Sequence, residues 1–165
     1  GTLAFFIPAS TTVTTSTTSL WQVNAWNFFT VTRSGSNIYL GINGSVQSFS
    51  WTSAIPDNAY GIYIGAQNGP GSISNYITGY LSGMRLVIGE SVSTYRANFT
   101  VPTTPPTATS NSVTAANTKL LLNFTNAGIY DGTMKNDLET VGNASVSTSV
   151  VKYGSGSMYF DGSGS

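Results

Sequence analysis

The chain has 165 residues, of which 40% are hydrophobic and 12% aromatic, enough for the core of one ordinary domain. Only 7% are charged, against roughly 25% in typical domains, and six Lys/Arg balance six Asp/Glu. Scattered cations argue against nucleic-acid binding, the absence of His and Cys excludes zinc fingers, thiol nucleophiles and serine–histidine triads, and no apolar run approaches the roughly 20 residues of a membrane span.

The predicted elements are strands throughout, because short segments rich in β-branched and aromatic residues recur with Gly, Asn or Pro between them. In chain order these segments are 3–7, 28–32, 37–43, 46–51, 60–65, 80–89, 119–124 and 156–160. The low-complexity stretch 10–19 is β-prone and predicts an edge strand or hairpin arm. No segment shows a convincing 3.6-residue apolar period. The regular spacing of turns predicts an antiparallel sandwich or jelly roll.

Alternation assigns faces to two of the predicted strands. Ile38, Leu40 and Ile42 share one face of their strand, and Asn43-Gly44 directly after them is the strongest short-range hairpin signal.

The second alternating strand is predicted over 80–89. It places Tyr80, Met84, Leu86 and Ile88 on one face and Arg85 on the other.

Three stretches together resemble the laminin-G-like, concanavalin A-like jelly rolls of the lectin and glucanase superfamily. In 26–45 a Trp opens a strand, an Arg-Ser-Gly turn follows, and the next strand ends in Asn-Gly. Residues 62–105 are similar to the family's closing half, with an Ile-Gly strand, a Gly-Tyr strand and an Asn-Phe exit toward prolines. Residues 119–165 are similar to its beginning, with a Leu-rich first strand, a Tyr-Asp-Gly turn and a final Tyr-Phe-Asp-Gly run. The resemblance implies an all-β, antiparallel β-sandwich.

The order of these stretches differs from a standard domain, because the beginning follows the end. The predicted organisation is the C-terminal two thirds of a jelly roll over 1–101, a Pro/Ser/Thr-rich linker over 102–117, and N-terminal jelly-roll strands over 118–165. Three explanations fit: a window on tandem copies, a permuted domain that folds back on itself, or strands that complete a neighbouring subunit. We favour the tandem and subunit-exchange explanations, since a half-sandwich leaves strand edges unpaired.

Catalysis is not expected. Glucanases of the resembled superfamily carry carboxylates at alternate positions of one strand face, to flank a glycosidic bond. The nearest match is Asp137-Leu138-Glu139, without a third carboxylate, and Glu90 stands alone in a turn. We therefore predict that the chain is not an enzyme.

Calcium is the cofactor that the resemblance allows, because laminin-G-like domains often carry one at the rim. Its ligands are carboxylate and carbonyl oxygens. Asp131, Asp137 and Glu139 form the only acidic cluster of the sequence, and Asp131 is the leading candidate for a calcium ligand. The alternative is that Asp131 bonds its own turn backbone, as Asp in turns usually does.

Sugar binding is the other candidate activity. The stretch 66–76 is predicted as a Gly/Pro-framed loop that offers Gln67, Asn68, Asn75 and Tyr76 for carbohydrate contacts. Trp51 shares a face with Phe49 and is predicted to pack in the core.

These expectations combine into a non-enzymatic structural and adhesive module. The charge-poor, Thr/Ser/Asn-rich composition suits a virion tail fibre or an extracellular filament at a cell surface. Expected partners are further copies of the chain or tandem repeats and cell-surface glycans, with no nucleic acid and no membrane insertion. The alternative is a discrete carbohydrate-binding lectin.

Overall fold

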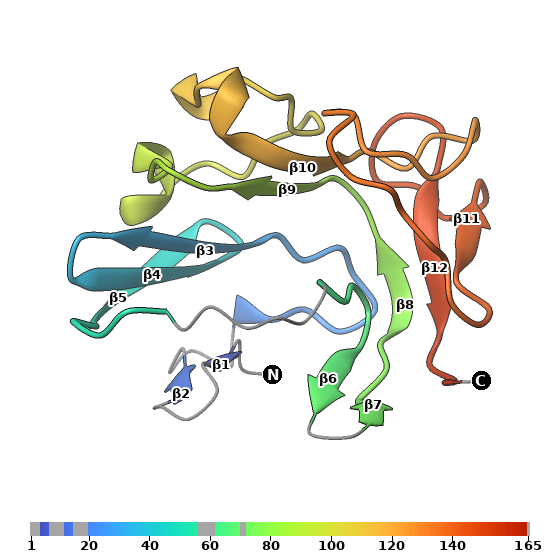
Figure 1. Ribbon diagram of the computed structural model, residues 1–165, viewed down its shortest axis with the longest axis horizontal. Coiled ribbons are helices and arrows are strands. Elements are labelled where there is room, and N and C mark those ends of the chain that lie inside the picture. The colour runs from blue at the N-terminus through green and yellow to red at the C-terminus, as the bar shows by residue number, and fades with distance from the viewer. Residues whose placement is uncertain (1–3, 7–11, 15–19, 56–61, 70–71, 165) are drawn as a thin grey trace. The chain divides into compact units, whose positions relative to one another are not determined.

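The computed structural model describes residues 4–6, 12–14, 20–55, 62–69 and 72–164, and these ranges are all-β (Figure 1). The strands are β1 (Ala4–Phe6), β2 (Thr12–Thr14), β3 (Phe29–Ser34), β4 (Asn37–Ile42), β5 (Ser45–Ser50), β6 (Gln67–Gly69), β7 (Ser72–Ser74), β8 (Thr78–Leu81), β9 (Met84–Val87), β10 (Thr118–Leu122), β11 (Ser145–Ser147) and β12 (Ser157–Asp161). Short 3-10 turns are η2 (Ser93–Arg96), η3 (Ser110–Ser112) and η4 (Ala115–Asn117). Every strand pairing between these elements is antiparallel.

The chain divides into two compact units. Unit 1 comprises residues 1–58, 88–103 and 111–113, and unit 2 comprises 59–87, 104–110 and 114–165. Unit 2 therefore contains strands from both sides of the predicted boundary at 102–117. Whether 118–165 also begins a further copy stays a prediction.

Unit 1 contains the three-stranded sheet β3–β4–β5, with β4 in the centre (Figure 1). The predicted alternation on β4 is confirmed, because Ile38, Leu40 and Ile42 are all buried. Trp51 forms a core cluster with Ile38 and Leu40, and Phe49 packs against it. The prediction that Trp51 is a packing residue is therefore confirmed.

The hairpin between β4 and β5 turns at Asn43-Gly44, as predicted. Both residues have positive φ, 49° and 89°, which the two-residue turn of a twisted hairpin requires. The Asn43 side chain also joins the turn to the preceding segment: its Oδ1 accepts the Phe28 N–H at 2.8 Å and its Nδ2 donates to the Leu20 carbonyl at 2.7 Å. A Cβ on Gly44 would overlap the Phe99 carbonyl oxygen, so only glycine fits.

An aromatic cluster packs beside this turn in unit 1. The Tyr95 and Phe99 ring centroids are 4.7 Å apart, and Phe28 lies 6.0 Å from Tyr95 and 5.7 Å from Phe99. These distances and the tilted planes are typical of favourable aromatic pairs. Backbone bonding fixes Phe99, whose N–H donates to the Gly44 carbonyl at 2.9 Å.

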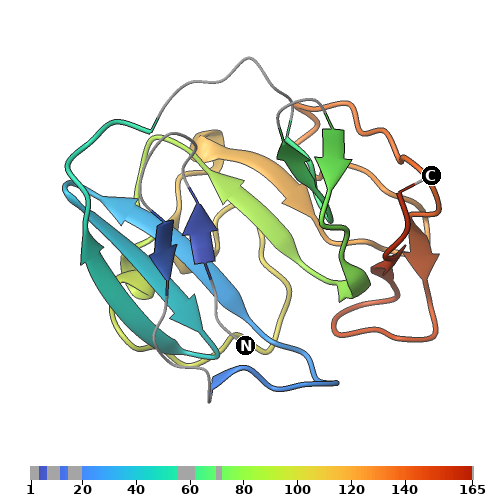
Figure 2. The same cartoon turned by 90° about the horizontal axis from the view of Figure 1, so that it is seen from below.

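Unit 2 is organised by the break between β8 and β9. The single strand predicted over 80–89 is wrong, because Ser82 and Gly83 interrupt it, with Gly83 at φ 65°. The two halves then pair with different strands: β8 with β12, and β9 with β10 (Figure 2). Residues 78–87 thereby join both ends of the 118–165 segment in one unit.

The break also changes which side chains are buried. Met84 and Leu86 pack against the unit 2 core as predicted, and Arg85 points the other way, donating to the Thr107 and Ser110 carbonyls at 2.9 and 2.7 Å. The single strand also predicts Tyr80 and Ile88 on the face of Met84 and Leu86, but these two side chains are 40% and 56% exposed. The turn with positive φ at Gly83 resets the alternation of faces between Tyr80 and Met84. Ile88 lies beyond the end of β9 at Val87, where the alternation of the strand no longer applies.

The core of unit 2 is built on β10 and β12. Its buried members are Leu120, Leu122, Phe124 and Met158. Partly buried side chains from the rest of the unit pack around them: Ile64, Leu81, Met84, Leu86, Ile129, Leu138, Ala144 and Phe160. Segments on either side of the proline-rich stretch therefore share one core.

The proline-rich stretch itself is bonded to unit 2. The Pro106 carbonyl accepts from Asn123 Nδ2 at 3.3 Å, and the Ala108 carbonyl accepts from the Thr118 hydroxyl at 2.7 Å. A Cβ on Gly83 would meet the Pro106 ring at 2.9 Å. Residues 104–110, predicted as linker, thus pack on the strands that they connect.

Three more predictions are partly tested by the described residues. Within 10–19, the described residues Thr12–Thr14 form β2 and pair with β1, which agrees with a hairpin arm. Of the strand predicted over 60–65, residues 62–65 are described and are not a strand. The stretch 66–76, predicted as a loop, contains the hairpin β6–β7.

We predict that Leu122→Ala lowers the free energy of unfolding by about 2–5 kcal/mol, because Leu122 is 2% exposed and truncation leaves a cavity. The matched control is Val141→Ala in the same unit, where Val141 is 65% exposed and the change should stay within about 0.5 kcal/mol. Urea denaturation followed by tyrosine and tryptophan fluorescence measures both. Equal effects of the two substitutions would contradict the assigned core.

Candidate functional site

Two tyrosines lie side by side on the sheet β11–β12–β8 of unit 2. Tyr159 of β12 is opposite Tyr80 of β8 and Ser145 of β11. The two ring centroids are 5.2 Å apart with an interplanar angle of 40°. The neighbouring residues Met158 and Phe160 belong to the core side, so alternation turns the tyrosines outward.

The same side of the sheet carries a carboxylate at its end. Asp161 follows Tyr159 by two positions and is paired with Thr78. Its Oδ1 accepts the Ser163 N–H and hydroxyl, each at 2.8 Å, and its Oδ2 accepts Asn143 Nδ2 at 2.8 Å. We call this outward side, with Tyr80, Tyr159, Ser145, Thr78, Asp161 and Asn143, the tyrosine face.

Asp161 is held in its ionised form. The backbone N–H of Ser163, the Asn143 amide and the Ser163 hydroxyl, in that order, lower the pKa of Asp161 below its ordinary value. The tyrosine face therefore presents two aromatic rings beside a fixed hydrogen-bond acceptor and a side-chain amide.

Tyr76 extends this surface beyond the start of β8. A Cβ on Gly164 would overlap the Tyr76 ring, and a Cβ on Gly162 would overlap the Thr78 hydroxyl. These two glycines let the chain after β12 run closely beside residues 76–78. Tyr76 thus lies at the Asp161 end of the tyrosine face.

The predicted sugar-binding residues occur on and beside the hairpin β6–β7. Asn75, at φ 52°, donates through Nδ2 to Gln67 Oε1 at 2.6 Å, and the Tyr76 hydroxyl donates to the Ile73 carbonyl at 3.0 Å. Gln67 and Asn75 are therefore brought together, whereas the Asn68 side chain lies outside the described residues. Carbohydrate binding by these four residues stays a prediction.

The Asp131 carboxylate is buried in the turn after β10 and bonded on both oxygens. Oδ1 accepts the N–H groups of Leu121 and Thr133, each at 2.9 Å. Oδ2 accepts the Thr133 hydroxyl at 2.6 Å, Asn136 Nδ2 at 2.7 Å and the Lys135 N–H at 3.2 Å. This arrangement matches the alternative considered for Asp131, namely bonding to its own turn.

These bonds decide the ionisation of Asp131. Burial raises the pKa of the carboxyl, but the hydrogen bonds from the Thr133 hydroxyl and N–H, from the Leu121 N–H and from Asn136 outweigh it and hold the pKa far below its ordinary value. The carboxylate is therefore a permanent acceptor at the edge of β10.

The other two predicted calcium ligands do not join Asp131. Asp137 and Glu139 are exposed, and within the described ranges no three Asp, Glu, His or Cys side chains are grouped as a metal site requires. Calcium binding stays a prediction, and the geometry assigns Asp131 a structural role.

Sequence reasoning missed the tyrosine face because it treats 80–89 as one strand and places Tyr80 on the face of Met84 and Leu86. The alternation Met158-Tyr159-Phe160 was visible in the sequence. What the sequence did not indicate is that β12 pairs with β8, which places Tyr159 opposite Tyr80.

Comparison with known proteins finds no relative: no protein-family model, curated protein or solved structure matches the chain. Within the described ranges, no helix has the length and apolar character needed to cross a bilayer. Function is therefore inferred from the chemistry of the described surface.

We predict that Asp131→Asn lowers the free energy of unfolding at pH 7 by roughly 1.5–3 kcal/mol, because charge-assisted bonds are lost at a buried site. Since the folded pKa is lowered, the stabilisation is complete above the unfolded pKa of about 4 and shrinks as pH falls below it. The gap between wild type and variant should narrow by about 1 kcal/mol at pH 3.

Urea denaturation at pH 7 and pH 3 measures this gap. Asp137→Asn is the matched control, since Asp137 is an exposed carboxylate two residues beyond Lys135. A gap for Asp131→Asn that is equal at both pH values would contradict the role given to its charge.

Proposed function

We propose that the chain is a non-enzymatic adhesive module that recognises cell-surface glycans through the tyrosine face. The observation that carries the proposal is the pair of exposed Tyr80 and half-buried Tyr159, with ring centroids 5.2 Å apart, beside the ionised Asp161 and the Asn143 amide. An aromatic surface packs against the apolar side of a pyranose, and fixed polar groups bond its hydroxyls.

The polar groups of this face suit a neutral sugar. Asp161 accepts three hydrogen bonds from the protein, one of them on Oδ2, which leaves Oδ2 capacity for a sugar hydroxyl. Asn143, Ser145 and Thr78 are exposed and supply further donors and acceptors. The absence of a catalytic carboxylate pair from this arrangement supports recognition without hydrolysis.

We propose further that the fold is a laminin-G-like jelly roll and that the chain belongs to a phage or viral fibre or to an extracellular filament. All-β architecture and a surface with few charges support it. Near-zero net charge also favours association, so the module is proposed to act in copies that combine weak sites.

A discrete lectin that binds its glycan as a monomer is the second candidate. The tyrosine face favours sugar recognition in both cases, and the strand pairings of 118–165 within one chain favour the monomer. Assembly state therefore separates the two candidates.

We predict saturable binding on a glycan array, with Tyr80→Ala and Tyr159→Ala each weakening affinity tenfold or more, about 1.4 kcal/mol, because each removes a ring from the platform. Tyr130→Ala is the matched control, since Tyr130 is 56% exposed and lies outside the tyrosine face. A folded wild type that binds no glycan, or that binds equally well as Tyr80→Ala, would refute the assignment.

Light scattering on a size-exclusion column addresses assembly. The fibre or filament proposal expects a mass above 17.3 kDa that rises with concentration. A constant monomer mass over a wide concentration range would favour the discrete lectin.

A further inference from the structure

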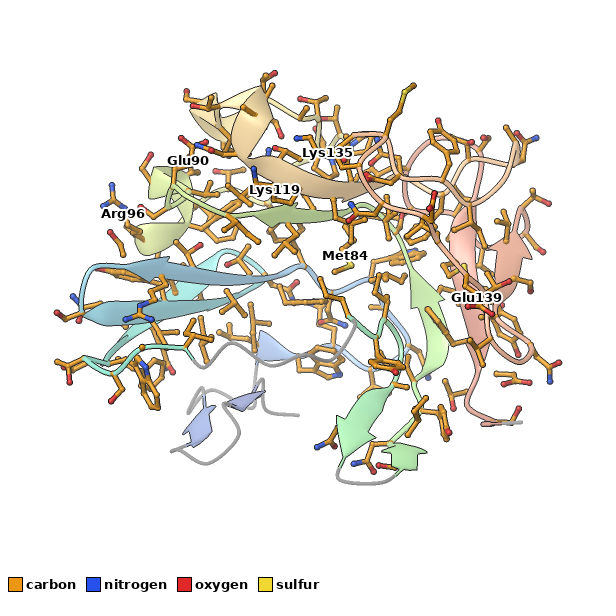
Figure 3. The ribbon with its side chains drawn as sticks, in the orientation of Figure 1. Met84, Glu90, Arg96, Lys119, Lys135 and Glu139 are labelled. Carbon is orange, nitrogen blue, oxygen red and sulfur yellow. The ribbon has the colours of Figure 1, made fainter. Side chains whose placement is uncertain are left out.

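Two lysine side chains of unit 2 converge on one carbonyl oxygen. Lys119 Nζ donates to the Ala116 carbonyl at 2.8 Å, and Lys135 Nζ donates to the Thr118 carbonyl at 2.7 Å and to the Ala116 carbonyl at 3.4 Å. The separation of the two nitrogens cannot exceed the sum of their distances to the shared oxygen. Figure 3 shows both side chains beside β10.

Both lysines are positioned by parts of the fold that are already fixed. Lys119 belongs to β10, and the Lys135 N–H donates to Asp131 Oδ2 at 3.2 Å. The turn that closes the β10 edge therefore fixes the Lys135 backbone, and the Thr118 and Ala116 carbonyls hold its ammonium. Little side-chain freedom is left to lose on binding.

The pair has unused hydrogen-bonding capacity and no opposite charge bonded to it. An ammonium has three donors; Lys119 uses one and Lys135 uses two in these contacts. Neither ammonium forms a salt bridge within the described residues. The Asp131 carboxylate accepts from backbone and side-chain groups of its turn and β10, and neither Nζ donates to it.

Each lysine contact taken alone is explained as the capping of a backbone carbonyl group. Carbonyl capping does not explain why two of the six cations of a charge-poor chain share one carbonyl oxygen. Two like charges this close repel each other, and an anion between them removes the repulsion. Three N–H donors of the two ammonium groups remain unused in these contacts, and several free donors on neighbouring ammonium groups suit an oxyanion with several acceptor oxygens.

We propose that Lys119 and Lys135 form a binding site for a tetrahedral oxyanion, the sulfate or phosphate ester group of a surface polymer. This site is independent of the tyrosine face, and it adds a charged ligand class to the neutral one proposed above.

The test is an NMR titration of the full chain with sodium sulfate, and separately with inorganic phosphate, against sodium chloride at matched ionic strength. We expect saturable shifts of the Lys119 and Lys135 ammonium and amide signals with the oxyanions. Lys119→Gln and Lys135→Gln should each weaken binding tenfold or more, while Lys135→Arg retains it because the charge and donors remain. Lys152→Gln, which removes a cation elsewhere, is the matched control and should bind as wild type.

Equal shifts with chloride, or unchanged sulfate affinity in a folded Lys135→Gln variant, would overturn the proposal. If one Gln variant unfolds, the proposal is still tested by the other two variants. Loss of sulfate binding in the folded Gln variant, with retention in Lys135→Arg, supports the site. Competition by a sulfated oligosaccharide or by a glycerol-phosphate polymer then identifies which polymer carries the bound oxyanion. If neither polymer competes, the site binds an adventitious ion only, and the surface-polymer assignment is wrong. Sulfate binding that persists in Tyr80→Ala separates this result from the fate of the tyrosine face.

Discussion

The hydrogen bonds around Asp131 close the outer edge of β10, and the architecture of unit 2 depends on that closure. β10 pairs with β9 on one side only; on the other, its N–H and carbonyl groups bond to the turn that Asp131 organises. Leu121 donates to Asp131 and accepts the Gly132 N–H at 2.7 Å, and the Lys119 carbonyl accepts Asn136 Nδ2 at 2.6 Å. An open strand edge invites pairing with another chain. Here a turn from the same chain occupies it, so β10 needs no partner strand at this edge.

In unit 1, neutral side-chain amides bond the edge of a strand and a hairpin turn, as the Asp131 carboxylate does in unit 2. On the outer edge of β5, Asn98 Oδ1 accepts the Val46 N–H at 2.9 Å, and Asn43 joins its hairpin to Phe28 and Leu20. Amides can donate and accept without the desolvation cost of a buried charge. The abundance of Asn is therefore explained in part by edge closure, and the remaining polar surface stays uncharged. Of the twelve charged side chains, four are those of Asp131, Asp161, Lys119 and Lys135.

Sequence reasoning was sufficient for local features and insufficient for long-range pairing. Strands with strong alternation, such as the one containing Ile38 and Leu40, and the Asn43-Gly44 turn follow from local chemistry, so they were predicted. The break at Gly83 depends on which strands are available to pair, and the local residue pattern does not indicate this long-range pairing. For the same reason the sequence alone places Tyr80 on the face of Met84 and Leu86, which it does not share in the structure. The Asp131 turn was recognised as an alternative to calcium, because an Asp that bonds its own turn is a local arrangement.

Amide hydrogen exchange at Leu121 is the most direct test of edge closure. With the edge closed by its own turn, we expect this N–H, on the outer side of β10, to exchange as slowly as the β10 amides that bond to β9, with protection that is independent of protein concentration. Exchange at the rate of an open strand edge would show that the turn does not close the edge. Protection that develops only as concentration rises would show that another chain closes it, and either result would refute closure by the Asp131 turn.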